Sequence, residues 1–339
     1  MRELEHLPEG LLGLGAPQLE AALHGPTLIH VKGRREPSLF VSVLMHGNET
    51  VGWEAVRDLL YGYAARGLPR SLSLFIGNVA AAAQGVRRLD HQPDYNRVWP
   101  GSDAEPTPEH QLMRQVVERM AARGVFASVD VHNNTGVNPH YACVNVIDHR
   151  FLHLATLFSR TVVYFLRPRG VQSMAMGELC PAVTLECGKV GQALGVEHAR
   201  DYLEACLHLS EHPVHPVAEH DIDLFHTVAQ VKVPEGISFG FGEPGLDIHF
   251  AEDLDHLNFR ELPRGTSLGW VRPGSSLHLD VRDERGRDVS DRFFLIEDNE
   301  LRVRVPLMPS MLTRDERVIR QDCLCYLMER YNDHLMVHE

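Results

Sequence analysis

A histidine and a glutamate stand three residues apart where an apolar segment gives way to a helical pattern. The segment 39–45 is largely apolar, His46 follows it, and Glu49 falls in the first turn of the helical pattern. Both side chains can converge on one point above the edge of a sheet, where they could share a zinc ion. The His-x-x-Glu spacing alone is weak evidence, and only this match lies at a strand-turn-helix junction. The other matches are His6/Glu9, His208/Glu211 and His249/Glu252.

A third metal ligand is expected at the end of another strand. Catalytic zinc takes three protein ligands and leaves a position for water, and two histidines with one glutamate are a known set. His132 ends the apolar segment 125–131, and the polar turn NNTG follows it. Asp130 points to the same side of that strand and could orient a ligand. We therefore predict one zinc ion per chain, held by His46, Glu49 and His132.

Glu186 is the predicted general base. A metal bound by two imidazoles and a carboxylate lowers the pKa of its water towards ~7, but hydrolysis still needs a base beside it. The apolar segment 182–185 runs into Glu186, and Gly188 follows shortly after. A glutamate at a strand end is more often solvated, so this assignment depends on the rest of the site.

A long loop gathers arginines in an otherwise acidic protein. Its sequence GVRRLDHQPDYNRVWPG carries Arg87, Arg88 and Arg97, with Asn96 beside the last. Guanidinium groups bind carboxylates through paired hydrogen bonds, and a positive charge near a metal can stabilise the oxyanion of a tetrahedral intermediate. Asn96 could share a carboxylate with Arg97. The alternative is that the loop arginines are merely solvated.

The elements that would position these residues alternate along the first two thirds of the chain. Apolar, β-branched segments interleave with helical patterns up to about residue 210, which indicates an α/β structure with a mixed or parallel sheet. The predicted strands are 27–31, 39–45, 72–76, 125–131, 141–147, 161–166 and 182–185, and the predicted helices are 56–63, 108–123 and 196–209.

The pattern changes beyond the His- and Pro-rich segment 211–220. Short strands between Gly, Pro and Asp turns predict a second, mostly β part. We therefore expect a catalytic domain over 1–212 and a β-rich domain over 213–339. The chain is predicted to end in a helix over 313–331, with Thr313 as its N-cap and acidic residues in its first turn.

Composition narrows the classes of function. A formal net charge of −13 over 339 residues argues against nucleic-acid binding, which needs a basic surface. No apolar run approaches the ~18 residues that cross a bilayer, so no membrane association is expected. The N-terminus is acidic where a secretory signal is basic, and the six cysteines form no CxxC pair, so we expect a cytoplasmic protein with reduced thiols. The oligomeric state is left open, a homo-oligomer included.

Together these motifs resemble the succinylglutamate desuccinylase/aspartoacylase family, relatives of the zinc carboxypeptidases. The matching motifs, in chain order, are HGNE, G-x-R-R followed by DYNR and Pro-Gly, DVH after a strand, and TLECGK. The later segment LDHLNFRELPRGTSLGWVRPG resembles the family's C-terminal β domain. The similarity spans most of the chain and weakens after about residue 300.

The resemblance implies a zinc carboxypeptidase-like mixed sheet flanked by helices, with a smaller C-terminal mostly-β domain. It also implies a zinc-dependent deacylase that cleaves the amide bond of an N-acyl amino acid, or of a similar small amide or ester bearing a carboxylate. The implied roles are zinc binding by His46, Glu49 and His132, general base and acid catalysis by Glu186, binding of a substrate carboxylate by Asn96 and Arg97, and polarisation of the scissile carbonyl by Arg88, with the choice between Arg88 and Arg87 open.

Two positions depart from the family's pattern and leave the substrate open. The desuccinylase branch has an arginine four residues after the metal histidine, where this chain has Gly136. The aspartoacylase branch has an arginine about ten residues before the glutamate, where this chain has Met176. The alternatives are a zinc carboxypeptidase acting on short peptides and a non-catalytic metal- or ligand-binding relative. The G-x-S-x-G match at 236–240 is discounted because Gly and Pro, rather than a helix, follow it.

Overall fold

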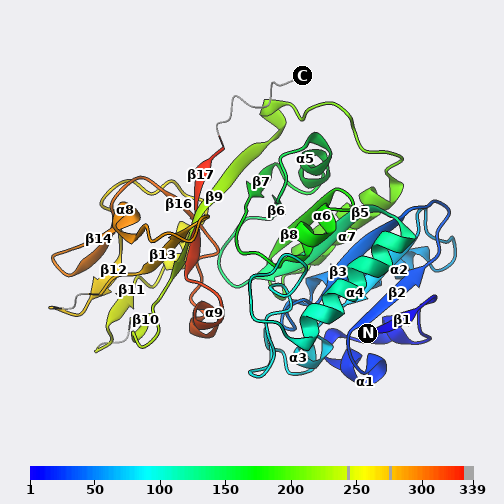
Figure 1. The fold of residues 1–339 in the computed structure, drawn as a ribbon, viewed down its shortest axis with the longest axis horizontal. Coiled ribbons are helices and arrows are strands. Elements are labelled where there is room, and N and C mark those ends of the chain that lie inside the picture. Colours follow the sequence, from blue (N-terminus) through cyan, green and yellow to red (C-terminus); the bar gives the residue numbers. More distant parts are fainter. Residues whose placement is uncertain (243–244, 275–276, 332–339) are drawn as a thin grey trace.

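The structure is a computed structural model that describes residues 1–242, 245–274 and 277–331, and two sheets organise this part of the chain (Figure 1). The larger sheet has 12 strands in the order β1-β2-β4-β3-β5-β8-β6-β7-β9-β17-β16, with β13 paired to β9. Its strands are β1 (Arg2–Leu4), β2 (Thr27–Val31), β3 (Ser38–Val43), β4 (Leu72–Ile76), β5 (Val125–Asn134), β6 (Tyr141–Val144), β7 (Thr161–Tyr164), β8 (Ala182–Lys189), β9 (Asp223–Lys232), β13 (Asp280–Asp283), β16 (Met308–Ser310) and β17 (Cys325–Arg330). The smaller, five-stranded sheet contains β10 (Phe239–Phe241), β11 (Ile248–Phe250), β12 (Ser267–Val271), β15 (Glu300–Val303) and β14 (Phe294–Glu297).

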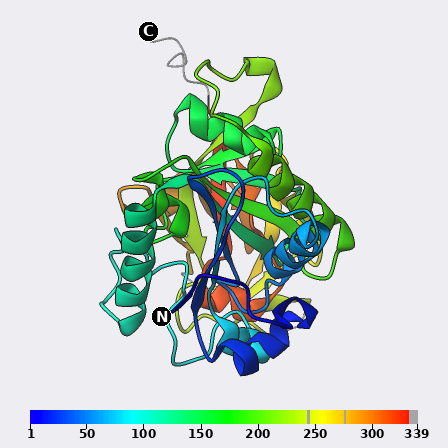
Figure 2. The same cartoon turned by 90° about the vertical axis from the view of Figure 1, so that its right-hand side faces the viewer.

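Helices cover both faces of the larger sheet. Every residue of β3 and β4 is buried, which is typical of strands that are covered on both sides. Figure 2 shows α4 on one side of the sheet and α2 with α7 on the other. The helices are α1 (Leu19–Leu23), α2 (Val51–Tyr63), α3 (Val79–Ala83), α4 (Pro108–Arg123), α5 (His149–Thr156), α6 (Gln172–Gly177), α7 (Ala193–His208), α8 (Ser290–Phe293) and α9 (Glu316–Gln321).

The predicted fold class is confirmed. The larger sheet mixes parallel pairs, such as β3 with β5, and antiparallel pairs, such as β6 with β8. The predicted strands 27–31 and 72–76 and the predicted helix 108–123 have the bounds of β2, β4 and α4. The loop that carries the arginines lies between α3 and α4, as expected. The sequence pattern therefore identified the elements that frame the site.

The C-terminal part extends the larger sheet. β9 pairs in parallel with β7. β17 and β13 both pair with β9 in the antiparallel direction. The sheet thus continues past residue 212, where the sequence predicted a boundary between domains. That division stays a prediction, but four strands from beyond it complete the sheet of the first part.

The predicted terminal helix over 313–331 is wrong. Only Glu316–Gln321 is helical, as α9, and Asp315 rather than Thr313 caps it by accepting a hydrogen bond from the Val318 amide. Residues Cys325–Arg330 form β17, which is hydrogen-bonded on both sides, to β9 and to β16. Strand pairing with residues about 100 positions earlier outweighs the local helical pattern, because it satisfies the backbone groups of this segment in a buried place.

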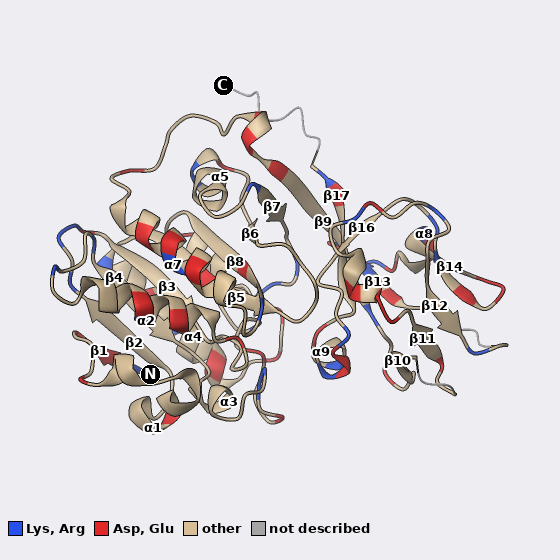
Figure 3. Ribbon diagram, turned by 180° about the vertical axis from the view of Figure 1, so that it is seen from behind, with Lys and Arg blue, Asp and Glu red and all other residues tan. Residues whose placement is uncertain are grey.

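The surface agrees with an acidic protein. Figure 3 marks Asp and Glu residues in red along α2, α4 and α7. All six cysteines are free and buried, in line with the expectation of reduced thiols. Within the described ranges, no helix combines the length and the apolar character that a membrane span requires.

Candidate active site

Three neighbouring strands bring His46, His132 and Glu186 together, and Glu49 lies in the turn between β3 and α2, just before the helix rather than in its first turn. β3, β5 and β8 are adjacent and parallel, so their carboxyl ends meet at one edge of the sheet. His132 and Glu186 are register partners on β5 and β8. His46 follows β3 after a turn in which Leu44 takes a left-handed conformation, with φ 57°. The sheet therefore places residues that are far apart in the sequence at one point.

The carboxylate of Glu49 lies between two imidazoles. Its Oε1 is 2.8 Å from Nδ1 of His46, and its Oε2 is 2.7 Å from Nδ1 of His132. All three side chains are buried, and one potential ligand atom from each lies within 4.8 Å of the others. The structure brings together the three residues predicted to bind metal.

Gly47 allows this turn to fit under α3. A Cβ at Gly47 would collide with the backbone of Ala81 and Ala82, and the Gly47 amide donates to the carbonyl oxygen of Arg87. Any larger residue would push the His46 turn away from the sheet. The glycine in HGNE is therefore explained by close backbone packing.

The second ring nitrogen of each histidine, Nε2, is hydrogen-bonded to an aspartate. Nε2 of His46 lies 3.0 Å from Asp94 Oδ1, and Nε2 of His132 lies 2.7 Å from Asp130 Oδ2. Ser42 in turn donates to Asp130 Oδ1 at 2.6 Å. Such carboxylate–histidine pairs fix the ring orientation and leave Nδ1 for a metal. Asp130 lies where the sequence placed an orienting group, whereas Asp94 was missed, although it stands within the DYNR motif.

The charges of this group are strongly coupled. Burial would lower the pKa of His132, but the charges of Asp130 and Glu49 raise it well above its usual value. Burial opposes ionisation of Glu49, yet His46 and His132 hold its pKa below the usual range. In the same way His46 and Arg87 hold the pKa of Asp94 well below its usual value, against burial. Both carboxylates are therefore ionised at neutral pH.

The donor set fits a zinc ion. Two imidazole nitrogens and a carboxylate oxygen are the ligands of a catalytic zinc, and each imidazole already has its second partner. A divalent ion held by both Nδ1 atoms and a Glu49 oxygen would satisfy all three groups.

Glu186 lies beside this group and lines the same pocket. It is buried, and its Oε2 has no hydrogen-bond partner among the described residues. Burial, together with the charge of Glu49, raises the pKa of Glu186 to about 8 against the opposing effect of His132 and His46. A buried carboxyl group that lines a pocket and has an oxygen without a partner is suited to exchange protons with a substrate.

The structure brings Arg87, and not Arg88, to the metal ligands. Nη1 of Arg87 is 3.5 Å from Glu49 Oε1, its Nη2 is 2.9 Å from Asp94 Oδ2, and its buried Nε has no partner among the described residues. Arg88 instead donates to the carbonyl oxygen of Gln92, at 2.8 Å within its own loop, and does not line the pocket. The sequence left the choice between these two arginines open, and of the two only Arg87 lies beside the predicted metal ligands.

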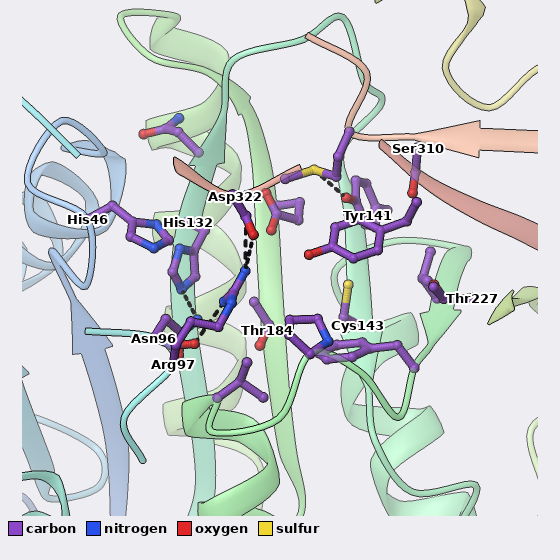
Figure 4. A pocket seen from close by; sticks show the side chains of 18 of the residues that line it. His46, Asn96, Arg97, His132, Tyr141, Cys143, Thr184, Thr227, Ser310 and Asp322 are labelled. Carbon is purple, nitrogen blue, oxygen red and sulfur yellow. Dashed lines mark hydrogen bonds and ion pairs between the residues drawn. The ribbon is translucent and has the colours of Figure 1, made fainter. Parts of the chain in front are cut away.

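Asn96 and Arg97 have partners within the chain. The Asn96 amide nitrogen donates to Asp130 and lies 3.1 Å from Nε2 of His132, while its oxygen accepts from the Gln172 amide at 2.9 Å. Nη2 of Arg97 lies 3.0 Å from both oxygens of Asp322 (Figure 4). The contacts make Asn96 a positioning residue for His132, and they give Arg97 a carboxylate partner that the sequence did not predict.

A pocket of about 680 Å³, its open mouth included, extends from these residues. Its far wall is largely apolar and includes Tyr141, Cys143, Val163 and Phe165 from the larger sheet. The C-terminal segment contributes Ser310, Met311, Asp322 and Tyr326 to the lining of the same pocket (Figure 4). The helix that the sequence predicted over 313–331 gave no reason to expect Asp322 and Tyr326 in this pocket.

Comparisons with known proteins agree on one family. A family model described as the succinylglutamate desuccinylase/aspartoacylase catalytic domain matches residues 35–212. The succinylglutamate desuccinylase of Burkholderia orbicola (strain MC0-3) is 28% identical over 173 residues, which cover 45% of this chain and 50% of that protein. The chain thus matches about half the length of this curated relative.

Solved structures extend the likeness to the fold as a whole. The succinylglutamate desuccinylase/aspartoacylase from Rhodobacter sphaeroides superposes with a TM-score of 0.57 and 16% identity, covering 89% of this chain and 88% of that one. Murine aminoacylase 3 gives a TM-score of 0.56 and 17% identity, covering 87% and 96%. At these identities the structures show a common fold, which reaches beyond the segment that the family model matches.

Proposed function

Because the chain belongs to the succinylglutamate desuccinylase/aspartoacylase family, we propose that it is a zinc-dependent amidohydrolase that removes the acyl group from a small N-acylated amine. N-acyl amino acids provide the general form of such a substrate. The observation that carries the proposal is the position of Glu49 between His46 and His132, with Glu186 beside them in register on the next strand. A ligand set and a base at one sheet edge are what metal-assisted hydrolysis requires.

His46, Glu49 and His132 would hold the ion through Nδ1, one carboxylate oxygen and Nδ1. A zinc ion bound there supplies Lewis acidity towards the acyl carbonyl and a more acidic water. Asp94 and Asp130 keep the two rings in place by accepting from the outer nitrogens. The protein therefore delivers a fixed set of ligands, with ring orientations set before any metal binds.

Glu186 is the proposed proton carrier. Glu186 lines the pocket and its buried Oε2 has no hydrogen-bond partner among the described residues, so we assign to it the proton of the attacking water, which it then passes to the leaving nitrogen. Burial, which raises its pKa, makes the protonated form accessible near neutral pH, as the second step requires. The same carboxyl group thus serves as base and then as acid.

Arg87 is the proposed stabiliser of the developing oxyanion. Its guanidinium is held by Glu49, Asp94 and Asp322, while Nε remains a buried donor without a partner in the described part of the chain. A donor fixed in this way stabilises negative charge without first having to reorganise. This role replaces the one that the sequence suggested for Arg88.

The competing function of a carboxypeptidase is less well supported. Ser310, Met311, Asp322 and Tyr326 contribute to a pocket of about 680 Å³, its open mouth included, which is the size of a small-molecule site. The other alternative, a non-catalytic metal-binding relative, would have no use for a buried, unpartnered Glu186. We therefore retain the deacylase.

Metal dependence is the test of the proposal. Protein stripped with a chelator should lose hydrolysis of a panel of N-acetylated amines and amino acids, measured by release of free amine, and one equivalent of zinc should restore it.

His132→Ala should bind less than one equivalent of zinc, because a three-ligand site loses a donor. His220→Ala is the matched control, since its side chain is 84% exposed and remote from the pocket. Stoichiometric zinc in His132→Ala would refute the ligand assignment, and a panel without zinc-dependent turnover would favour the non-catalytic relative.

A further inference from the structure

The C-terminal segment places a carboxylate on the arginine that was expected to hold the substrate's carboxylate. Asp322 follows α9 and projects into the pocket, where Arg97 Nη2 contacts both of its oxygens at 3.0 Å (Figure 4). Asp322 Oδ2 also lies 3.3 Å from Arg87 Nη2. One aspartate therefore bridges both arginines that line this end of the pocket.

The charges at this end are already balanced within the chain. The Arg97 and Asp322 side chains are 23% and 15% exposed, so their contact is only weakly screened by water. The charges of Arg97 and Arg87 hold the pKa of Asp322 below its usual value against burial, so it is ionised at neutral pH. The other hydrogen bond of Arg97 goes to the carbonyl oxygen of Asn96 at 2.8 Å. A second carboxylate arriving at Arg97 would meet the negative charge of Asp322.

The third arginine of the lining is also paired with an acid. Arg167 is the third arginine of the pocket, and its Nε donates to the carbonyl oxygen of Glu284 while its Nη1 pairs with Asp103. The opposite wall contains Val163 and Phe165, which are apolar. Among the described residues, the pocket thus presents the metal ligands, a balanced polar end and an apolar wall.

We infer that Asp322 is a specificity-determining residue, the resident counter-ion of Arg97, and that the substrate accordingly carries no carboxylate beside its scissile amide. The substrate class is an N-acylated amine or the amide of an N-acylated amino acid, rather than an N-acyl amino acid with a free carboxylate. This inference rests on the proposed amide hydrolysis and narrows its substrate. Its physical basis is repulsion between two carboxylates that would compete for one guanidinium.

Matched pairs of substrates test the inference on the natural sequence. N-acetyl-L-leucine and N-acetyl-L-leucinamide, and the corresponding phenylalanine pair, differ only in the charge beside the scissile bond. The zinc-loaded wild-type protein should give kcat/KM values about tenfold or more higher for the amides, as expected when like charges approach in a partly buried site. Equal values, or a preference for the free acids, would overturn the inference.

Asp322→Asn probes the residue itself. The substitution keeps the shape of the side chain, removes its charge and frees the charge of Arg97, so the ratio should shift by about tenfold or more towards the free acids. Glu316→Gln is the control, because it removes an exposed carboxylate from the same segment and should leave the ratio unchanged. If Asp322→Asn does not fold, as judged by near-ultraviolet circular dichroism, the wild-type ratio alone decides.

Binding separates failure of this inference from failure of the proposed reaction. Calorimetric titration of N-acetyl-L-leucine into Glu186→Gln and into Glu186→Gln/Asp322→Asn should show about tenfold tighter binding to the double variant, with no gain for N-acetyl-L-leucinamide. If the double variant binds the free acid more tightly but the wild-type protein shows no turnover, Asp322 still selects against a carboxylate, and the proposed hydrolysis is refuted. If the wild-type protein turns over substrate and prefers the free acid, the proposed hydrolysis stands and the inference about Asp322 is refuted.

Discussion

At the scale of single residues, Glu186 is the side chain whose environment has no structural explanation. A buried carboxyl group normally forms hydrogen bonds with both oxygens, because leaving one without a partner costs about 1–3 kcal/mol. Glu186 lines the pocket, and its buried Oε2 has no partner within the described ranges. Glu186→Gln should therefore retain zinc and lower kcat by about 10²–10⁴-fold, the usual contribution of general acid–base catalysis. Zinc content and kcat, measured on the same preparation, check this.

The control for this substitution is Glu178→Gln. Glu178 is an exposed glutamate just before β8, so the loss of its charge should leave kcat unchanged. If Glu186→Gln turned over substrate at the wild-type rate, Glu186 would have no part in proton transfer. If it lost zinc as well as activity, its role would be to support the metal ligands.

The sequence predicted the residues of the site where a buried strand delivers a polar side chain to a sheet edge. His46, His132 and Glu186 follow strands whose apolar pattern is clear, so their convergence could be expected. Arg87 and Arg88 are adjacent in a loop without periodicity, and nothing local decides which one faces the metal ligands. Asp322 could not be predicted at all, because its place depends on how the last strand pairs.

At the scale of elements, the segment that supplies Asp322 is fixed against the turn that follows β5. Asn258 holds the Leu312 backbone by donating to its carbonyl oxygen and accepting from its amide. A Cβ at Gly136 would collide with that same carbonyl oxygen. The position where the desuccinylase branch has an arginine is thus filled here by the chain's own C-terminal segment, which explains why Gly136 stands there.

Gly136→Ala should accordingly destabilise the protein, by about 1–3 kcal/mol, since an added methyl group must displace packed backbone. Gly62→Ala is the paired control. Nothing lies within 4 Å of a Cβ at Gly62, which is exposed near the end of α2, so alanine should be neutral or stabilise by up to about 1 kcal/mol. Urea unfolding of both variants and of wild type measures the change in the free energy of unfolding that each substitution causes. If Gly136→Ala leaves the stability unchanged, the backbone at Leu312 can move away from the added methyl group at little cost.

At the scale of the whole molecule, the catalytic part and the C-terminal part meet at the site. The larger sheet takes strands from both parts. Asp322, which lies just before β17, forms an ion pair with Arg97 of the arginine loop. The change of pattern after residue 210 correctly indicated a second, mostly β part. It could not show that β9 and β17 return to the first sheet, because their partners lie far away in the sequence. The C-terminal part is therefore a structural component of the pocket.

The Asp322 ion pair should give the molecule a pH-dependent share of its stability. Because the arginines lower the pKa of Asp322 on folding, against burial, its contribution is fully present above the unfolded value of about 3.9 and is lost as pH falls through the lower, folded value. Breaking a largely buried pair costs about 3 kcal/mol, so Asp322→Asn should unfold more easily than wild type by that amount at neutral pH. The difference should stay constant down to about pH 4 and shrink below it, where protonation of Asp322 makes wild type resemble the variant. Urea unfolding of both proteins across this range measures the difference, in which titrations common to both cancel. A difference that persists unchanged in acid would show that Asp322 stabilises the fold through its shape rather than through its charge.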